Sequence, residues 1–479
     1  MEGMEICGYT DASHHMEPRR MVRPVSLAPL LAAALLAGCA ATGNPPLAPP
    51  EAAFVVLGED GVPIARALTT AHDCPAIAID GHVAPMAVRA PRSPIPARPG
   101  HAGQPPTAPI LSCETLLPPG ATHVAVAGQA LPLPKKDVRR IVVIGDTGCR
   151  IKGKDVQDCA DPAAYPFARV AASAAAWKPD LVVHVGDYHY REDPCPAGRA
   201  GCAGSPWGYG WEAWNADFFA PARALLAAAP WVLVRGNHET CARAGQGWWR
   251  FLDPHPWEPA RSCDDPANDG AGDYTDPYAV PLGPDLQLLV VDTANTTYKG
   301  FQPGDARLPR YAAMRRRLDE LARRTPHGIA ADHHPLYAFG AERLPSGVRL
   351  FGGDAGLVQA FGTVDARLLP ANVDVLLSGH VHLWEQVSFS SDHPTQFVSG
   401  FAGTAEDTVP LPSVPPPGAE PAPGARVASM RSWIDGFGFM TMERTGPDRW
   451  SVLVHDRDGR PHDRCEVVGR RSTCTAAGL

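Results

Sequence analysis

The feature that most constrains the fold of this chain is a series of short apolar segments spaced along its middle. Each is four or five residues long and apolar on both faces, which is typical of strands buried inside a sheet. Between them lie three segments whose composition and spacing predict helices, at 166–177, 211–228 and 311–324. This alternation predicts an α/β fold. The predicted strands are 141–144, 181–185, 231–234, 288–292, 328–332 and 373–377.

Five polar motifs follow predicted strands, and most place a glycine beside a side chain that can bind metal. They are Gly145-Asp146-Thr147-Gly148, Gly186-Asp187-Tyr188-His189-Tyr190, Gly236-Asn237-His238-Glu239, His333-His334-Pro335 and Gly379-His380-Val381-His382. Open α/β sheets bind ligands just beyond the carboxyl ends of their strands, so the motifs are expected to meet. A single motif of this kind is more often a turn or a surface pair. The ordered set favours a two-metal site.

The ordered set resembles the calcineurin-like metallophosphoesterases and, within them, the purple acid phosphatases, over residues 138–405. The broader family opens with Asp-x-His, but this chain has Asp146-Thr147-Gly148 there. The purple acid phosphatase pattern uses Gly-Asp-x-Gly and supplies the missing ligand from Gly-Asp-x-x-Tyr. Both motifs are present, and the second ends at Tyr190. The resemblance implies a four-layer α/β/β/α sandwich.

The resemblance also implies the metal ligands. The family pattern before the fifth ligand is Val-x-x-His-x-Pro, and His333-His334-Pro335 keeps it except that Ala330 stands at the valine position. Both histidines are therefore candidates, and the pattern favours His333. One metal would be bound by Asp146, Tyr190 and His382, the other by Asn237, His333 and His380, and Asp187 would bridge the two.

The donor types agree with this assignment. Carboxylate and tyrosinate oxygens suit ferric iron, whereas an amide and two imidazoles suit divalent zinc, manganese or iron. Two metals about 3.5 Å apart can clamp a phosphate and generate hydroxide to attack it. His238 is the expected general acid, with hydrogen bonding to a ligand as its alternative role. His334 and Arg191 are candidates for contacts to phosphate oxygens, although both could have ordinary structural roles.

Three functions are compatible with such a site. The first is a phosphatase that hydrolyses phosphomonoesters, with an acidic pH optimum if one metal is ferric iron. The second is a phosphodiesterase or nucleotide hydrolase on the same scaffold. The third is a surface-binding lipoprotein that keeps the metal site as a remnant, which the presence of all the ligand positions and His238 disfavours. The net charge of −8 gives no reason to expect nucleic-acid binding.

The N-terminal segment predicts export and lipid anchoring. Three arginines precede an apolar core at 27–38, and Leu36-Ala37-Gly38-Cys39 is similar to a bacterial lipobox, in which Cys39 is lipidated. The alternatives are an ordinary signal peptide or a membrane anchor, but the apolar run is short for a membrane span. The predicted location is the periplasmic or cell-surface side of a bacterial membrane.

The remaining chain divides by composition into four parts after a signal peptide at 1–38. In the segment 53–136, short apolar stretches alternate with Pro/Gly turns, which predicts a β-rich region. Strands at 396–399 and 436–442 are expected to complete the second sheet of the catalytic domain, with a last strand at 450–455. The parts are a Pro-rich tether at 39–52, a small β-rich N-terminal domain at 53–136, a catalytic domain at 137–458 and a C-terminal tail at 459–479.

Cysteine usage agrees with export. The chain has twelve cysteines, and ten remain when Cys7 and Cys39 are set aside. An even number suits disulfides in an oxidising compartment, and no Cys-x-x-Cys spacing suggests a metal site. Ten cysteines permit many pairings, of which proximity in the sequence suggests Cys74–Cys113, Cys149–Cys159, Cys195–Cys202, Cys241–Cys263 and Cys465–Cys474.

Overall fold

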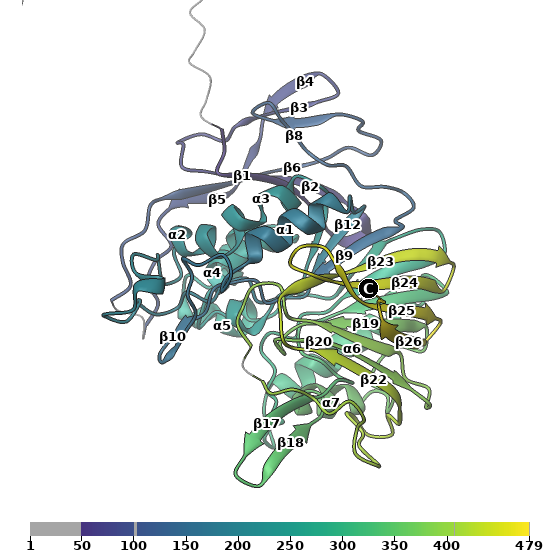
Figure 1. Cartoon of the computed structure of the whole chain (residues 1–479). Helices are drawn as coiled ribbons and strands as arrows, with labels where there is room; N and C mark the ends of the chain where they lie inside the picture. The colour runs from purple at the N-terminus through teal and green to yellow at the C-terminus, as the bar shows by residue number, and fades with distance from the viewer. Residues whose placement is uncertain (1–48, 100–102, 407, 479) are drawn as a thin grey trace, which may run out of the picture. The chain divides into compact units, whose positions relative to one another are not determined.

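The apolar segments form strands of two large sheets in a computed structural model, which describes residues 49–99, 103–406 and 408–478 (Figure 1). The described residues belong to one unit, Leu47–Leu479. The predicted signal peptide and Cys39 lie outside the described residues. No helix in the described ranges combines the length and apolar character that crossing a membrane requires.

The first sheet has 11 strands in the order β26-β25-β24-β23-β9-β12-β13-β1-β2-β6-β5. Its centre is parallel, with β9 paired to β12 and β12 paired to β13. The central strands are β1 (Ala52–Leu57), β9 (Arg140–Ile144), β12 (Leu181–His184) and β13 (Trp231–Leu233). The others are β2 (Pro63–Thr69), β5 (Ala87–Ser93), β6 (Ile110–Leu116), β23 (Gly438–Gly446), β24 (Arg449–Asp456), β25 (Pro461–Val468) and β26 (Arg471–Ala476).

The second sheet has seven strands in the order β14-β15-β16-β19-β21-β20-β22. Strands β15, β16, β19 and β21 are parallel, and the outer strands are antiparallel. The strands are β14 (Tyr278–Pro281), β15 (Leu286–Val290), β16 (His327–Ala331), β19 (Val373–Ser378), β20 (Trp384–Phe389), β21 (Thr395–Ser399) and β22 (Val427–Trp433).

Three small sheets lie outside the two large ones. Two are hairpins, β10 (Ile151–Lys152) with β11 (Asp155–Val156) and β17 (Gly340–Leu344) with β18 (Gly347–Phe351). The third has the order β4-β3-β7-β8, with β3 (Ala76–Ile79), β4 (His82–Pro85), β7 (Val124–Val126) and β8 (Gln129–Ala130).

The helices are few and mostly short. Helix α1 (Phe167–Ala176) matches its prediction, and α6 (Arg307–Ala322) begins four residues before the predicted start at 311. Helix α7 (Ala355–Gly362) was not predicted. The short helices are α2 (Trp211–Trp214), α3 (Ala220–Leu226), α4 (Gly245–Gly247) and α5 (Asp269–Gly272).

The single helix predicted at 211–228 is interrupted by a π-helical turn, Asn215–Phe219, between α2 and α3. Pro221 explains the interruption because proline has no N–H to donate to the carbonyl four residues earlier. That carbonyl belongs to Asp217, and it accepts a hydrogen bond of 2.8 Å from the Tyr165 hydroxyl instead.

Alternate residues of the parallel strands face different cores, as the geometry of a strand requires. Val143 and Val183 of the first sheet pack in one core with Leu288 and Val375 of the second. The opposite face of the first sheet, with Val142 and Val182, packs in a second core with residues of α1 and α3. Leu289 and Leu376 of the second sheet pack in a third core with α6 and α7. Each large sheet therefore has one face toward the other sheet and one toward helices.

The strands outside the central motifs differ from the predicted arrangement. The segment expected as a small N-terminal domain, 53–136, is β-rich, but four of its strands join the 11-stranded sheet, where β1 is parallel to β13. Strand β21 lies in the second sheet as predicted. Strand β23, predicted for that sheet, instead pairs antiparallel with β9 in the first sheet. The segment expected as a tail, 459–479, forms the β25–β26 hairpin at the edge of the first sheet.

Candidate metal centre

The predicted ligands follow the carboxyl ends of parallel strands in both sheets. Asp146, Asp187 and Asn237 lie just beyond β9, β12 and β13, which are adjacent and in parallel register. His333 follows β16 and His380 follows β19, its neighbour in the second sheet. Tyr190 and His382 lie a few residues further along these loops. The ends of the two sheets therefore supply all seven predicted ligands to one region, as the contacts below show.

The backbone is strained at three of these positions. Asp146, Asp187 and His380 have φ angles of 53°, 58° and 71°, in the left-handed region that residues other than glycine seldom adopt. Such strain is typically found at functional sites. Gly186 has a φ angle of 100°, and a Cβ atom there would lie 2.4 Å from Nδ1 of His333. This glycine is needed both for the turn and for the approach of the histidine.

The first group of donors surrounds the hydroxyl oxygen of Tyr190. This oxygen lies 2.9 Å from Oδ1 of Asp146, 2.8 Å from Oδ2 of Asp187 and 2.9 Å from Nε2 of His382. A phenol has one hydrogen to donate, so it cannot satisfy two carboxylates and an imidazole together. Burial, followed by the charges of Asp146 and Asp187, raises the pKa of Tyr190 well above its usual value. A bound cation would satisfy all four groups.

The second group of donors surrounds the side-chain oxygen of Asn237. Oδ1 of Asn237 lies 3.0 Å from Nε2 of His333 and 3.0 Å from Nδ1 of His380. Nε2 of His333 is also 3.2 Å from Oδ2 of Asp187, the same oxygen that contacts Tyr190. Asp187 therefore joins the two groups through one oxygen, which is the position of a bridging ligand.

Backbone carbonyls orient two of the histidines. Nδ1 of His333 lies 2.8 Å from the carbonyl oxygen of Val185, and Nδ1 of His382 lies 2.8 Å from that of Ala405. An imidazole that donates from Nδ1 keeps Nε2 free for a metal. Burial alone would lower the pKa of His333, but the Asp187 carboxylate raises it to about 10. A metal at this site would therefore displace a proton from His333.

Glu239 fixes the backbone of the loop that carries Asp187. Its carboxylate accepts hydrogen bonds from the N–H groups of Asp187, Tyr188 and His189, at 3.2, 2.9 and 3.2 Å, and from Gly236 at 3.1 Å. Burial and the Asp187 charge raise the pKa of Glu239 to about 8. The sequence places Glu239 in a recognised motif, but its contacts alone identify this role.

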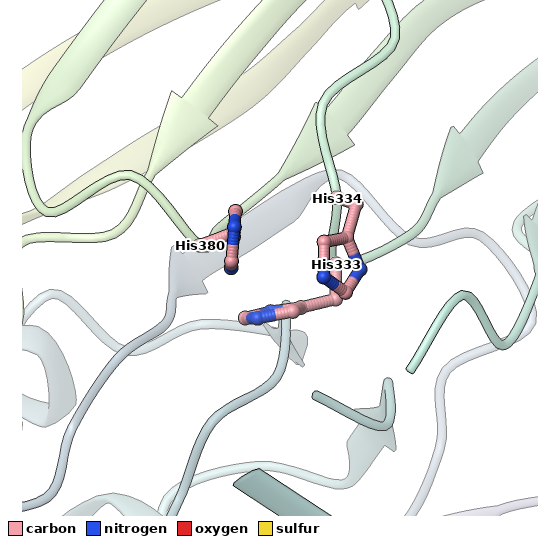
Figure 2. A group of neighbouring side chains, drawn as sticks. All are labelled: His333, His334 and His380. Carbon is pink, nitrogen blue, oxygen red and sulfur yellow. The ribbon is translucent and has the colours of Figure 1, made fainter. Parts of the chain in front are cut away.

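His334 lies beside the second group without the contacts of His333. Figure 2 shows the rings of His333, His334 and His380 together, and the ring centroids of His334 and His380 are 4.3 Å apart. One nitrogen from each of the three histidines lies within 4.8 Å of the others. Nδ1 of His334, however, lies 3.2 Å from the Thr293 hydroxyl. The contacts to Asn237 and Asp187 are made by His333, the histidine that the family pattern favours.

His238 lies at the edge of the centre, where it lines a cavity of about 250 Å³. Its backbone N–H donates to Oδ1 of Asp187 at 2.8 Å, and its ring Nδ1 lies 2.9 Å from the carbonyl oxygen of His189. Its ring packs on that of Tyr190 with centroids 3.8 Å apart. Burial and the neighbouring Arg243 guanidinium lower the pKa of His238 to about 4.

The cationic residues around the cavity are not those predicted. Arg191 is held by Asp217, with Nε 2.7 Å from Oδ1, and does not line the cavity. Arg150, Lys152 and Arg243 line it instead. No local sequence pattern distinguishes these three residues, because their common position arises only from the fold.

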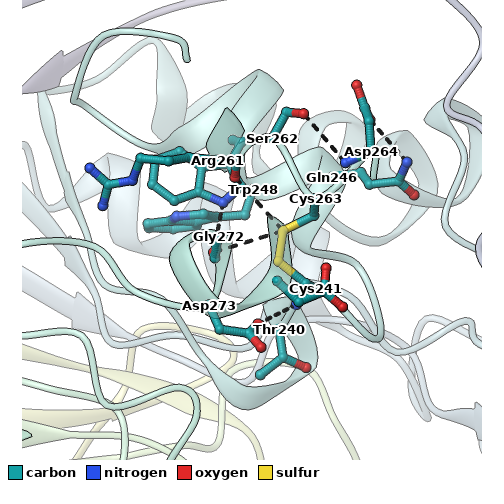
Figure 3. The surroundings of a disulfide bond; sticks show 12 residues. Thr240, Cys241, Gln246, Trp248, Arg261, Ser262, Cys263, Asp264, Gly272 and Asp273 are labelled. Carbon is teal, nitrogen blue, oxygen red and sulfur yellow. Dashed lines mark hydrogen bonds between the residues drawn. A yellow bond between two sulfur atoms is a disulfide. The ribbon is translucent and has the colours of Figure 1, made fainter. Parts of the chain in front are cut away.

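All five predicted disulfides are present. Three of them close loops next to the centre, at Cys149–Cys159, Cys195–Cys202 and Cys241–Cys263. Figure 3 shows Cys241–Cys263, which begins three residues after His238, with the N–H of Cys241 donating to Oδ1 of Asp273 at 2.7 Å. These bonds restrict the long loops that carry the donors.

The donor set fits a pair of metal ions. It combines two carboxylates, a phenol, an amide and three imidazoles, which are mostly buried and approach one another at hydrogen-bonding distances. Several close pairs have too few hydrogens to be satisfied without a cation. These residues are suited to a two-metal centre.

Comparisons with known proteins identify the family and the fold. The family model described as calcineurin-like phosphoesterase matches residues 139–383, just over half of the chain. Among solved structures, the purple acid phosphatase PPD1 from yellow lupin (Lupinus luteus) seeds is 13% identical, with a TM-score of 0.54 over 88% of this chain and 74% of that chain. PhoD is 11% identical, with a TM-score of 0.51 over 90% of this chain and 92% of that chain. At these identities the similarity shows the fold. No curated protein sequence matches significantly.

Proposed function

This chain belongs to the calcineurin-like phosphoesterase family of metal-dependent phosphoric ester hydrolases, and we propose that it is an exported phosphatase of the purple acid phosphatase type. The observation that carries this proposal is the position of Tyr190. Its hydroxyl oxygen lies within 2.9 Å of Asp146, Asp187 and His382, where the Asp-x-His version of the family has a histidine ligand. The reaction proposed is hydrolysis of phosphomonoesters.

The oxygen-rich group, Asp146, Tyr190 and His382 with Asp187, would hold ferric iron. The nitrogen-rich group, Asn237, His333 and His380 with Asp187, would hold divalent zinc, manganese or iron. Bound metal ions would supply Lewis acidity at the phosphate and lower the pKa of a water nucleophile. The backbone contacts of His333 and His382 through Nδ1 would leave Nε2 of both imidazoles available to the metals.

The chain itself supplies the proton for the leaving group. His238 lines the cavity next to Asn237, so its ring reaches the substrate side of the centre. The hydrogen bond from its backbone N–H to Asp187 fixes the position of His238 relative to the carboxylate that would bridge the metals. Protonated His238 would donate to the departing alkoxide oxygen. Its lowered pKa, about 4, is consistent with activity at acidic pH.

The test is a pH-resolved hydrolysis assay on a chromogenic phosphomonoester and its matching diester. The protein would start at Ala40, be produced under oxidising conditions and be supplied with iron, zinc or manganese. A monoester preference at acidic pH that disappears in Asp187→Asn would support the phosphatase proposal. A diester preference would replace it with the phosphodiesterase, and no turnover with metal bound would favour a non-catalytic binding protein.

Tyr190→Phe tests the ferric site directly. If tyrosinate binds ferric iron, the oxidised wild-type protein should be purple, because charge passes from the phenolate to the metal on excitation. The variant removes only the hydroxyl, so the fold should remain while the visible absorption band disappears. The spectra should be compared at equal iron content, measured by elemental analysis. An unchanged band in the iron-loaded variant would exclude Tyr190 as the ligand.

Export and lipid anchoring are part of the same proposal. The five disulfides support folding in an oxidising compartment. Cys39 would carry the lipid and hold the enzyme at the bacterial membrane. Mass spectrometry of the N-terminal peptide from cells should show a lipidated Cys39. A mature protein with unmodified Cys39 or with another start would refute the anchor.

A further inference from the structure

We propose that Arg150, Lys152 and Arg243, here called the cationic rim, select phosphomonoesters whose leaving group carries a second anionic group. The chemistry recognised would be a carboxylate or a second phosphate close to the ester. This inference rests on the proposed function, because it names the substrate class of the same centre. The inference depends on different residues from the proposed function, because none of the three rim residues is a predicted metal ligand.

With two metal ions bound, the cavity would contain more positive charge than one phosphate requires. Its floor is formed by predicted ligands, and two metal ions there would already bind the phosphate that is cleaved. The rim adds three further cations, while the acidic groups near them are Asp155 and Asp187, which line the cavity, and Glu192, which pairs with Lys152 and Arg243. These three cations gather at one cavity in a chain of net charge −8, so their clustering is a local feature.

Arg243 is held rigidly beside the general acid. Its Nε donates to Oε2 of Glu192 at 2.9 Å, and its Nη2 pairs with Oε1 of the same carboxylate. Nη2 also lies 2.8 Å from Nε2 of His238, and Nη1 donates to the carbonyl oxygen of Asn237 at 3.3 Å. The guanidinium therefore lies on the side of the cavity where the leaving group receives its proton. A fixed guanidinium there is preorganised to bind an anion.

Lys152 provides a second cation at the same place. Its Nζ lies 3.2 Å from Oε1 of Glu192, the oxygen that also pairs with Nη2 of Arg243. Because both cations contact one oxygen, they are close enough to bind one anionic group together. The Lys152 side chain is 52% exposed, whereas that of Glu192 is 7% exposed. An exposed ammonium gains little from such a pair and can turn toward an incoming anion.

The hairpin that carries Lys152 is attached to the metal centre. The N–H of Ile151 donates to the carbonyl oxygen of Tyr190 at 3.0 Å, and the N–H of Glu192 donates to that of Ile151 at 3.1 Å. The Cys149–Cys159 disulfide closes the base of β10–β11. The segment with the Tyr190 ligand therefore also positions Lys152 and Glu192. This arrangement fixes the rim relative to the predicted ligand Tyr190, which selection of a second charge requires.

The experiment compares two esters of similar size, 3-carboxyphenyl phosphate and 3-carbamoylphenyl phosphate, on the metal-loaded protein. We expect a higher kcat/KM for the carboxylate, and Lys152→Gln should lower this preference roughly fivefold, the size of one partly exposed ion pair. Lys152→Glu should reverse it. Lys154→Gln is the matched control, because Lys154 lies exposed on the same hairpin and does not line the cavity. High salt should weaken the preference.

The outcomes separate this inference from the proposed function. Hydrolysis of both esters with no preference, or with a preference that Lys152→Gln leaves unchanged, overturns the proposed role of the rim in substrate selection. An equal loss in Lys154→Gln also overturns it, because the effect would then be one of net charge. If neither ester is hydrolysed, the proposed function fails. The preference for the carboxylate ester can then be measured as the ratio of the calorimetric affinities of the two intact esters. An affinity preference that depends on Lys152 would still support the rim.

Discussion

Asp187→Asn is expected to lower kcat/KM for a phosphomonoester by at least about 10³-fold, which corresponds to roughly 4 kcal/mol of transition-state stabilisation. Oδ2 of Asp187 lies 2.8 Å from Tyr190 and 3.2 Å from His333, so one oxygen serves both groups of donors. An amide keeps the shape but removes the charge that holds two cations together. Metal content should fall from two ions toward one per chain, as measured by elemental analysis beside the kinetics.

The structure also indicates why Asp187→Asn should affect the metal centre without disturbing the surrounding loop. The N–H groups of the Asp187 loop are held by Glu239, and His238 donates to Oδ1, a contact that an amide oxygen can accept. Asp193→Asn is the matched control, since Asp193 lies six residues away and accepts from the N–H of Gly153. The control should keep both activity and metal content. Two metals and near wild-type rates in Asp187→Asn would show that Asp187 does not bridge.

The sequence was sufficient to predict the strands that carry the centre. All six predicted strands are confirmed, within a few residues at their ends. Their pattern is local, because burial on both faces demands a continuous apolar run whatever the neighbours are. The five disulfides were also predictable, since each joins cysteines no more than 39 residues apart.

Strand partners were not predictable in the same way. Strand β23 was expected in the second sheet, but Met440 pairs with Val143 of β9 in the first. The first five residues of β23 are buried. Its sequence pattern therefore predicts a strand inside the protein but does not indicate which strand it pairs with. The strands between 53 and 136 likewise have sequences that do not indicate their pairing partners. Their turns suggest a small domain, whereas β1 continues the large sheet beside β13.

The cations of the cavity were missed for a related reason. Arg191 follows the predicted ligand Tyr190 directly and was one of two candidate phosphate contacts, but it is paired with Asp217 and does not line the cavity. Arg243 occupies an ordinary loop, and it gains its position from Glu192, which lies 51 residues earlier. A contact over such a separation leaves no local pattern. The predicted metal ligands were easier to identify because each belongs to a recognisable motif at a strand end.

His238→Asn is expected to slow hydrolysis of an alkyl phosphomonoester by roughly 10²- to 10³-fold, the usual contribution of a general acid. An alkoxide is a poor leaving group unless it is protonated, whereas 4-nitrophenolate leaves without help. The loss on 4-nitrophenyl phosphate should therefore be much smaller. Measuring kcat for both esters in wild type and variant gives this difference directly. His82→Asn, an exposed histidine on β4, is the control for the substitution itself.

The pH profile provides the second part of this test. Burial and Arg243 lower the pKa of His238 to about 4, so the protonated form is present below that pH and is lost as pH rises through it. The wild-type rate on the alkyl ester should fall on the alkaline side of this pKa. His238→Asn has no proton to lose, and its profile should lack that fall.

The alternative role of His238 predicts a different pattern. If the histidine ring only supports the centre, through its contacts with the His189 carbonyl oxygen and the Tyr190 ring, its replacement should disturb both esters equally and reduce metal affinity. A general acid acts on the leaving oxygen alone, so metal content should stay at two ions while the alkyl and aryl rates diverge. Equal losses on the two esters, with a pH dependence that survives in the variant, would assign the proton to another donor and leave His238 a structural part of the centre.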